Sequence, residues 1–143
     1  MEENLEITKE IKIDLTNSKY ATGRRKTSIA KIWLTKGSGK IIVNGKKFQD
    51  YFSSDTHKMQ ILRPFEIIDQ ATQYDVRCQV VGGGHTGQAG AMVHGISRAL
   101  IKFDGSFKPT LRKEKLTTRD SRAVERKKPG RAKARKSYQF SKR

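Results

Sequence analysis

The last quarter of the chain restricts its fold more than any other feature. Residues 108–143 carry fifteen Lys or Arg and three Asp or Glu, a net charge of +12 out of +17 for the whole chain. A segment with so much like charge repels itself and buries little apolar surface, so it does not fold alone. The hydrophobic core must therefore come mainly from the residues before 108, and the basic end requires a polyanionic partner.

Charge also divides the rest of the chain. Residues 1–18 contain five acidic residues and two Lys, whereas residues 19–107 carry a net charge of +8. We expect an acidic extension over 1–18, a globular domain over 19–107 and a basic segment over 108–143, irregular from about residue 129. No apolar run approaches the roughly 20 residues of a membrane span, and the N-terminus does not resemble a signal or transit peptide. With one cysteine, Cys78, the expected location is cytoplasmic, without a membrane.

Alternating apolar residues predict β-structure at the start of the domain. Ala30, Ile32 and Leu34 would share one face of a strand, with Ile29 and Trp33 on the other. Residues 41–43 predict a second strand, which the Asn44-Gly45 pair closes as a type I′ hairpin. Within the acidic extension, residues 11–15 alternate well enough to pair as an edge strand. The domain therefore begins with antiparallel pairing.

Helical periodicity follows. Residues 48–52 and 56–65 predict short helices, the second with Met59, Ile61 and Leu62 on one face and ended by Pro64. Residues 73–81 alternate as a half-buried strand, and the helical pattern is strongest from Ala89 to Phe103. A short helix over 108–116 and a last edge strand over 119–128 complete the prediction. This order predicts an α+β fold, a small mixed sheet with helices packed on one face, followed by a long extended basic tail.

A glycine-rich segment joins the strand over 73–81 to the long helix. Gly82, Gly84 and Gly87 match the G-x-G-x-x-G of dinucleotide-binding folds. The second strand of such a fold is missing, because Asp104 lies at the end of the helix. The Gly-Lys-Ser/Thr of a Walker A loop is also missing, and the GXXG loop of KH domains joins two helices instead. Two interpretations stay open: backbone N–H groups that bind phosphate, or a tight turn with close packing.

Catalytic patterns are weak. His57, His85 and His94 lack metal-ligand spacing, and Cys78 falls on the apolar face of its strand. No Ser or Cys lies in a nucleophile-elbow context. We expect no enzyme, no metal, no cofactor and no small-molecule substrate.

The basic tail allows two interpretations from its composition. It could be a solvated terminus or a general nucleic-acid clamp, as in a free regulatory or chromatin-like protein. However, Tyr138 and Phe140 interleave with Arg135, Lys136 and Lys142. Cations can pair with phosphates while rings stack on bases, which favours a defined path along RNA.

Four stretches of the sequence resemble one protein family: TGRRKTSIAKIWL, VVGGGHTGQAGAMVHGISRAL, LTTRDSRAVERKKPGRAKARKS and the ending QFSKR. In order and spacing over residues 19–143, they resemble the small-subunit ribosomal proteins numbered nine, in their bacterial and organellar form. The sequence departs from that pattern at Val81, where a basic residue is expected, and at Pro129, where many members carry an aromatic residue.

The resemblance implies a structural protein of the head of the small ribosomal subunit, with a fold like the second domain of ribosomal protein five. Its partners would be the 3′ major domain of small-subunit rRNA, neighbouring head proteins and peptidyl-site tRNA, on a cytoplasmic or organellar ribosome. By motif, Lys142 and Arg143 would contact the tRNA. The residues implied to contact rRNA are Arg24, Arg25, Lys26, Gly82, Gly83, Gly84, Gly87, Gln88, Gly90, Arg126, Lys127, Lys128, Arg131, Lys133, Arg135, Lys136, Tyr138 and Phe140.

Overall fold

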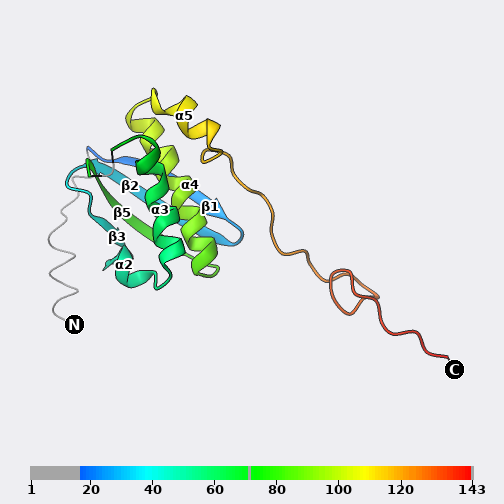
Figure 1. Cartoon of the computed structure of the whole chain (residues 1–143). Coiled ribbons are helices and arrows are strands. Elements are labelled where there is room, and N and C mark those ends of the chain that lie inside the picture. The colour runs from blue at the N-terminus through cyan, green and yellow to red at the C-terminus, as the bar shows by residue number, and fades with distance from the viewer. Residues whose placement is uncertain (1–16, 71, 143) are drawn as a thin grey trace.

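The computed structural model of the chain describes residues 17–70 and 72–142. It contains one five-stranded sheet with strand order β1-β2-β5-β3-β4 (Figure 1). The strands are β1 (Lys19–Arg25), β2 (Ser28–Lys36), β3 (Ile41–Val43), β4 (Lys46–Lys47) and β5 (Tyr74–Val81). The predicted edge strand over 11–15 lies outside the described residues.

The sheet is mixed, as predicted. β1 pairs antiparallel with β2, and β2 pairs antiparallel with β5. β3 lies on the other side of β5 and pairs with it in parallel, because the chain crosses over through two helices between these strands. Asn44 (φ 50°) and Gly45 (φ 81°) turn the chain from β3 into β4, with the two positive φ angles that a type I′ turn requires.

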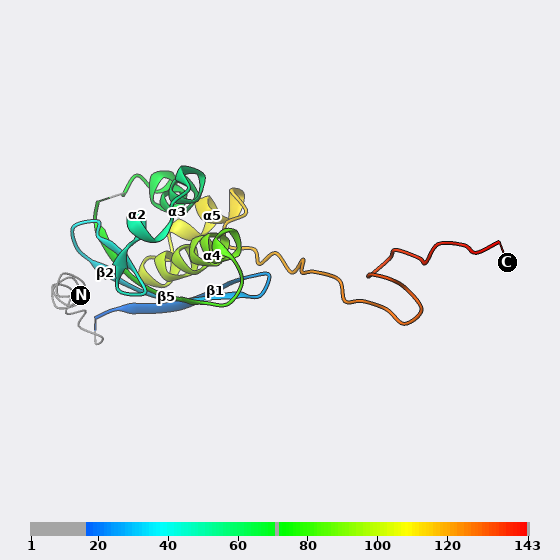
Figure 2. The same ribbon diagram turned by 90° about the horizontal axis from the view of Figure 1, so that it is seen from below.

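Within the described residues, four helices form, and they lie on one face of the sheet (Figure 2). They are α2 (Phe48–Tyr51), α3 (Asp55–Ile67), α4 (His85–Phe103) and α5 (Phe107–Lys113). None of the helices in the described parts of the chain combines the length and the hydropathy that a membrane crossing needs. The architecture confirms the predicted α+β class with helices on one face.

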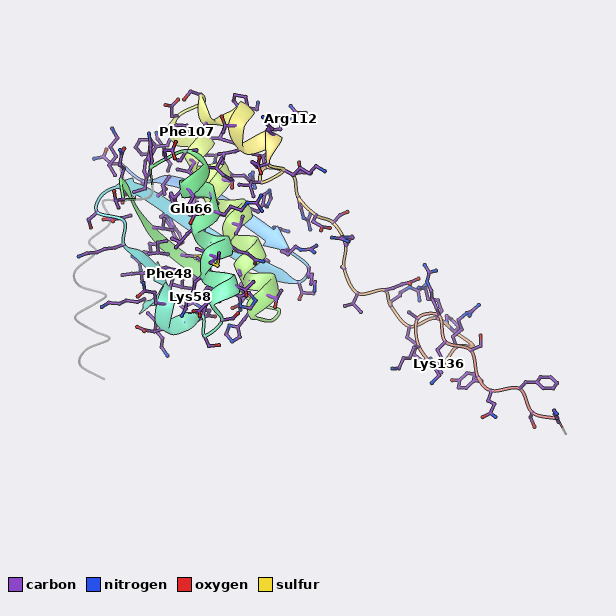
Figure 3. The ribbon with its side chains drawn as sticks, in the orientation of Figure 1. Phe48, Lys58, Glu66, Phe107, Arg112 and Lys136 are labelled. Atoms are coloured by element: carbon purple, nitrogen blue, oxygen red, sulfur yellow. The ribbon has the colours of Figure 1, made fainter. Side chains whose placement is uncertain are left out.

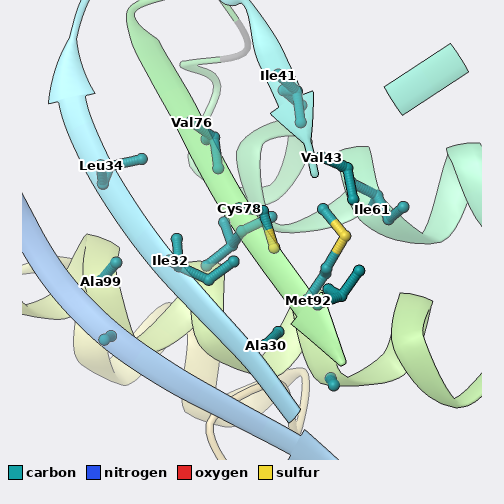
Figure 4. Packing of buried hydrophobic residues seen from close by; sticks show 14 of the residues in the cluster. Ala30, Ile32, Leu34, Ile41, Val43, Ile61, Val76, Cys78, Met92 and Ala99 are labelled. Atoms are coloured by element: carbon teal, nitrogen blue, oxygen red, sulfur yellow. The ribbon is translucent and has the colours of Figure 1, made fainter. Parts of the chain in front are cut away.

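The hydrophobic core lies between the sheet and the helices. Ile32, Leu34 and Val76 project from the strands toward Met92 on α4 and Ile61 on α3, and all five are fully buried (Figure 4). Cys78 is buried among them, as its place in the alternating pattern of β5 predicts. The core reaches beyond residue 107, because Leu111 of α5 is fully buried in it. Leu116 is partly buried and packs against the core. The division of the chain at residues 18 and 107 stays a prediction.

Helix α4 approaches β1 unusually closely. A β-carbon at Gly23 of β1 would lie 1.8 Å from the carbonyl oxygen of Ala91 and 2.4 Å from the backbone nitrogen of Gly95, both on α4. Helix and strand backbones can touch here only because both positions facing each other are glycine. This contact fixes where the end of β1 lies, and with it the basic residues that follow.

Three local predictions were wrong. Strand β1 was not predicted, because Lys19–Arg25 contains few apolar residues. The strand is stabilised by its antiparallel pairing with β2. Helix α3 continues through Pro64 to Ile67, since Pro64 and Phe65 are buried in the core and their packing outweighs the lost backbone hydrogen bond. Met59 is 71% exposed and does not belong to the buried face of α3, whereas Ile61 is fully buried and Leu62 packs partly against the core, as predicted.

The edge strand predicted over 119–128 is also wrong. These residues form neither helix nor strand, and together with 129–142 they run away from the body as an irregular tail (Figure 1). The alternation of apolar residues there is too sparse to offer a face for burial: Val124 is 93% exposed.

Candidate nucleic-acid interface

The tip of the β1–β2 hairpin presents three consecutive cations. Arg24 and Arg25 end β1, and Lys26 lies in the tight turn with a φ of 51°. Arg24 and Lys26 are exposed, and Arg25 is half-buried. The pairing of Arg25 with Ser28 across the turn brings these side chains together at one end of the sheet.

The glycine-rich segment packs directly on this hairpin tip. Ser28 donates from Oγ to the carbonyl oxygen of Gly82 at 3.0 Å. Gly82 (φ 75°) and Gly83 (φ 63°) take left-handed conformations that favour glycine. A β-carbon at Gly83 would lie 2.1 Å from Ser28 Oγ, and one at Gly82 would lie 2.7 Å from the carbonyl oxygen of Thr27. Close packing therefore accounts for both of these residues.

Gly87, Gln88 and Gly90 belong to α4, which begins at His85, before the predicted start at Ala89, and Gly84 is the residue that precedes the helix. A β-carbon at Gly87 would lie 2.7 Å from Ser28 Oγ, and one at Gly90 would lie 3.0 Å from Arg25 Cγ. Gln88 donates to the carbonyl oxygen of Gly82 at 3.2 Å and accepts from the hydroxyl of Tyr51 at 2.9 Å. These residues position the hairpin tip, whereas Gly84 alone has open space at its Cβ position.

A carboxylate ties the start of the tail to the hairpin tip. Asp120 Oδ2 lies 2.8 Å from Arg25 Nη1 and 2.8 Å from Arg122 Nη2. The side-chain and backbone hydrogen bonds from Arg122, with the charges of Arg122 and Arg25, hold the pKa of Asp120 well below its usual range. The tail therefore leaves the body at a fixed point, beside Arg25.

Between the hairpin tip, α3, α4 and the start of the tail lies a hollow with basic walls. Its lining includes Arg24, Arg25, Arg63, His94, Lys115 and Asp120. Arg63 also pairs with Glu114 at 3.0 Å, and Arg25 with Asp120. The cations exceed the carboxylates, so the hollow suits an anion such as a phosphate group.

His94 lies in the wall of this hollow and connects two chain segments. Its Nδ1 accepts a hydrogen bond from the backbone N–H of Arg24 at 3.3 Å, and its ring also bonds to the backbone of Thr117. Burial, the largest cause, and the nearby Arg98 lower the pKa of His94. A neutral imidazole thus joins β1 to the segment that leads into the tail.

The tail contains a loop held by its own charges. Arg135 Nε donates to Glu125 Oε2 at 2.9 Å, and Lys128 bonds to the same carboxylate. Gly130 (φ 71°) turns the chain, and Arg131 donates to the carbonyl oxygen of Arg135 at 2.8 Å. The predicted cations of this region project from the trace in several directions, Lys136 among them (Figure 3). The cations exposed here are Arg126, Lys127, Arg131, Lys133, Arg135 and Lys136.

The end of the tail is open. Tyr138 is 67% exposed and Phe140 is 84% exposed, so neither ring takes part in the core. Lys142 is exposed at the far end of the described chain, and Arg143 lies outside the described residues. The structure therefore brings the predicted site residues into two groups, one at the hairpin tip and one along the tail.

Sequence reasoning missed Asp120, His94, Arg63 and Lys115 as parts of this region. For Asp120 a signal existed, because it is one of three acids among the fifteen cations of residues 108–143. The other three come from segments far apart in the chain, and only the fold brings them to one hollow. Within the described residues, no group of three or more His, Cys, Asp or Glu could hold a metal ion.

A compact α+β body, a basic hollow and a charged irregular tail define a polyanion-binding protein. Comparison with known proteins gives the family: the family profile described as "Ribosomal protein S9/S16" matches residues 23–143. The chain belongs to this family of ribosomal, RNA-binding proteins.

Similar curated proteins agree. The chain is 56% identical over 132 residues to the "Small ribosomal subunit protein uS9" of Rickettsia canadensis (strain McKiel), which covers 92% of this chain and 82% of the relative. It is 55% identical over 139 residues to the protein of the same description from Rickettsia prowazekii (strain Madrid E), which covers 97% of this chain and 86% of the relative. The resemblance found in the sequence motifs is thereby confirmed.

Proposed function

We propose that this chain is a structural, non-catalytic protein of the head of the small ribosomal subunit, on a cytoplasmic or organellar ribosome. Its body binds rRNA of the 3′ major domain beside neighbouring head proteins, and its tail passes through rRNA toward the peptidyl-site tRNA. The observation that carries the proposal is the anchored tail: Asp120 is held by Arg25 and Arg122, and every residue beyond it to Lys142 lies outside the core.

The body supplies a docking site of fixed shape. The hairpin tip with Arg24, Arg25 and Lys26 is held by the glycine-rich segment, so the backbone that carries these cations is in place before RNA binds. The adjacent hollow has room for a phosphate group among Arg63, Lys115 and Arg24. Cations held in place in this way fix the register of a protein on RNA, because phosphate contacts position the protein without reading the bases.

The tail supplies charge over a long path. Its cations can neutralise successive phosphates and release counterions, while Tyr138 and Phe140 stack on unpaired bases. Glu125 holds Arg135 and Lys128 in the absence of RNA, as a phosphate would do in its presence. Lys142 and Arg143 come last, and these residues would reach the tRNA.

Crosslinking in cells tests the location. The protein is tagged at its N-terminus so that Arg143 stays free, crosslinked, and the attached RNA is sequenced. We expect crosslinks in the 3′ major domain of small-subunit rRNA, with adducts of the tail to tRNA. Crosslinks scattered over many RNAs or over DNA would instead indicate a general polyanion binder and refute the proposal.

Shortening the tail tests its end. Deleting Lys142 and Arg143 should weaken tRNA binding at the peptidyl site while the protein still enters the subunit. The matched control replaces Lys46 and Lys47 of β4 with Gln, which removes two exposed cations without shortening the tail. If the shortened protein does not enter subunits, or if the control weakens tRNA binding equally, the assignment of the last two residues is wrong.

A further inference from the structure

The sheet face opposite the helices carries two neighbouring aromatic rings. Tyr20 of β1 pairs with Trp33 of β2, and Trp33 pairs with Arg77 of β5, so the three side chains form one row across the sheet. The ring centroids of Tyr20 and Trp33 lie 5.3 Å apart, with the ring planes at 46°. Tyr20 is 40% exposed and Arg77 is exposed. Burial in the core therefore does not account for this aromatic pair.

A hollow lies beside Trp33, over the outward residues of β5. It is lined by Trp33, Asn44, Arg77, Gln79 and Val81, among others. The side-chain amide of Asn44 donates to the carbonyl oxygen of Val80 at 3.0 Å and accepts from its N–H at 2.9 Å, which holds the rim of the hollow in place. The walls combine an indole ring and an apolar side chain with a guanidinium and an amide, a set that suits a nucleobase and its phosphate.

The charge on this face points to an anionic partner. The outward positions of β1, β2 and β5 include Arg24, Lys31 and Arg77. Asp75 is the only carboxylate among those positions, and it lies at the far end of β5, where it accepts from the backbone N–H groups of Ser38 and Lys40 at 2.8 Å each. Among the residues that the structure describes, no other outward carboxylate on β1, β2 or β5 lies near the cations that flank the aromatic pair.

We propose that this face binds an unpaired stretch of RNA, with Trp33 and Tyr20 stacking on bases while Lys31 and Arg77 pair with phosphates. Exposed aromatic side chains on a β-sheet are one of the ways in which proteins recognise single-stranded RNA. Stacking needs accessible base faces, which a duplex hides, so the face selects unpaired RNA. The inference takes RNA as the ligand from the proposed function, but it concerns a second surface, separate from the tail.

Tryptophan fluorescence, excited at a wavelength that tyrosine does not absorb, reports on this face, because Trp33 is the single tryptophan of the chain. Full-length protein is titrated with a fluorescently labelled single-stranded RNA and, separately, with a labelled duplex of the same length. Anisotropy of the label measures total binding, including binding through the tail. We expect the single strand to quench Trp33 and the duplex to bind without quenching it.

Two variants sharpen the test. Arg77→Gln should shift the midpoint of Trp33 quenching to roughly tenfold higher RNA concentration, as should Tyr20→Ala. Lys46→Gln, a loss of one exposed cation on β4, serves as the matched control and should leave the midpoint unchanged.

Three results would overturn the inference: binding of the single strand without a change in Trp33 emission, equal quenching by the duplex, or an unchanged midpoint in both variants. The face would then be a docking surface for something other than unpaired RNA. Because anisotropy reports all RNA binding, whichever surface is used, an increase in anisotropy without Trp33 quenching leaves the proposed function intact. Failure of both signals would count against the proposed function itself.

Discussion

Substitution of Gly23 by Ala should disturb both the core and the basic hairpin tip. The added methyl would lie 1.8 Å from the carbonyl oxygen of Ala91 and 2.4 Å from the backbone nitrogen of Gly95. Neither obstacle is a side chain that can rotate away, so α4 and β1 must separate by more than an ångström. The core between them contains Ile32, Met92 and Ile96, all fully buried, and it would loosen as a result.

The expected cost follows from packing energetics. Overpacking of a well-filled core typically costs about 1–3 kcal/mol, and contact with two backbone atoms places Gly23→Ala near the upper end, at about 3 kcal/mol. Small domains have free energies of unfolding of about 5–15 kcal/mol, so the variant should fold with a much reduced margin. With a urea m-value of about 2 kcal/mol/M, the unfolding midpoint should fall by roughly 1.5 M.

Urea unfolding followed by Trp33 fluorescence measures this shift. Gly105→Ala is the matched control, because a β-carbon there meets no atom within 4 Å and the residue does not require positive φ. The control should stay within about 0.5 kcal/mol of the wild type. If Gly23→Ala is as stable as Gly105→Ala, the close approach of α4 to β1 does not exist in solution and the account of the core given above is wrong.

Four further predictions concern single side chains. Leu111→Ala removes a fully buried side chain and should lower the free energy of unfolding by about 2–5 kcal/mol in the same urea assay; no change would show that α5 does not pack on the body. The pKa of Asp120 is lowered in the folded state, so its contribution to stability is present at neutral pH and is lost as the pH falls below about 4. In acid titrations by circular dichroism, Asp120→Asn should therefore lose less stability over that range than the wild type. The pKa of His94 is also lowered, so stability should decline as the pH falls below about 6.5, and His94→Gln should flatten that slope; an equally steep slope in the variant would exclude His94 as its cause. Burial raises the pKa of the Cys78 thiol, so a thiol reagent should label it only when urea unfolds the chain.

The sequence was sufficient to predict secondary structure where buried residues recur with a regular period. β5 was predicted from the alternation of Tyr74, Val76, Cys78 and Val80, and these residues do point into the core. The Asn44-Gly45 turn was predicted from the conformational preference of that pair alone. In such segments, local chemistry and tertiary packing favour the same structure.

The sequence was insufficient where tertiary contacts decide the local structure. The parallel pairing of β3 with β5 depends on the path of the helices between them. The residues of β3 themselves do not indicate this path. The helix through Pro64 reflects the burial of Pro64 and Phe65, which only the assembled core provides. The glycine-rich segment admitted two explanations, and close packing against Thr27 and Ser28 became visible only when the hairpin was seen beside it.

For the candidate site, the motifs located the cations but not their arrangement. Arg24 and Arg25 were singled out with the tail, yet their link through Asp120 requires the position of both in space. From the sequence alone, His94 was seen only to lack metal-ligand spacing, whereas its ring bonds to the backbone of Arg24 and of Thr117. Which residues form an ion pair across almost a hundred positions of the chain is decided by the fold, so the sequence alone does not reveal it.

The ion pair between Arg25 and Asp120 attaches the start of the tail to the body, so the reach of the tail is set by the number of residues after Asp120. Residues 121–142 can extend at most about 3.3–3.6 Å each, so Lys142 can lie no farther than roughly 80 Å from Asp120. Inserting or deleting one residue after Asp120 would move the end of the tail by about one such step, with every charge along it displaced equally. Under the proposed function, we therefore expect the tail to tolerate substitution of individual cations better than a change in the number of residues between Asp120 and Lys142.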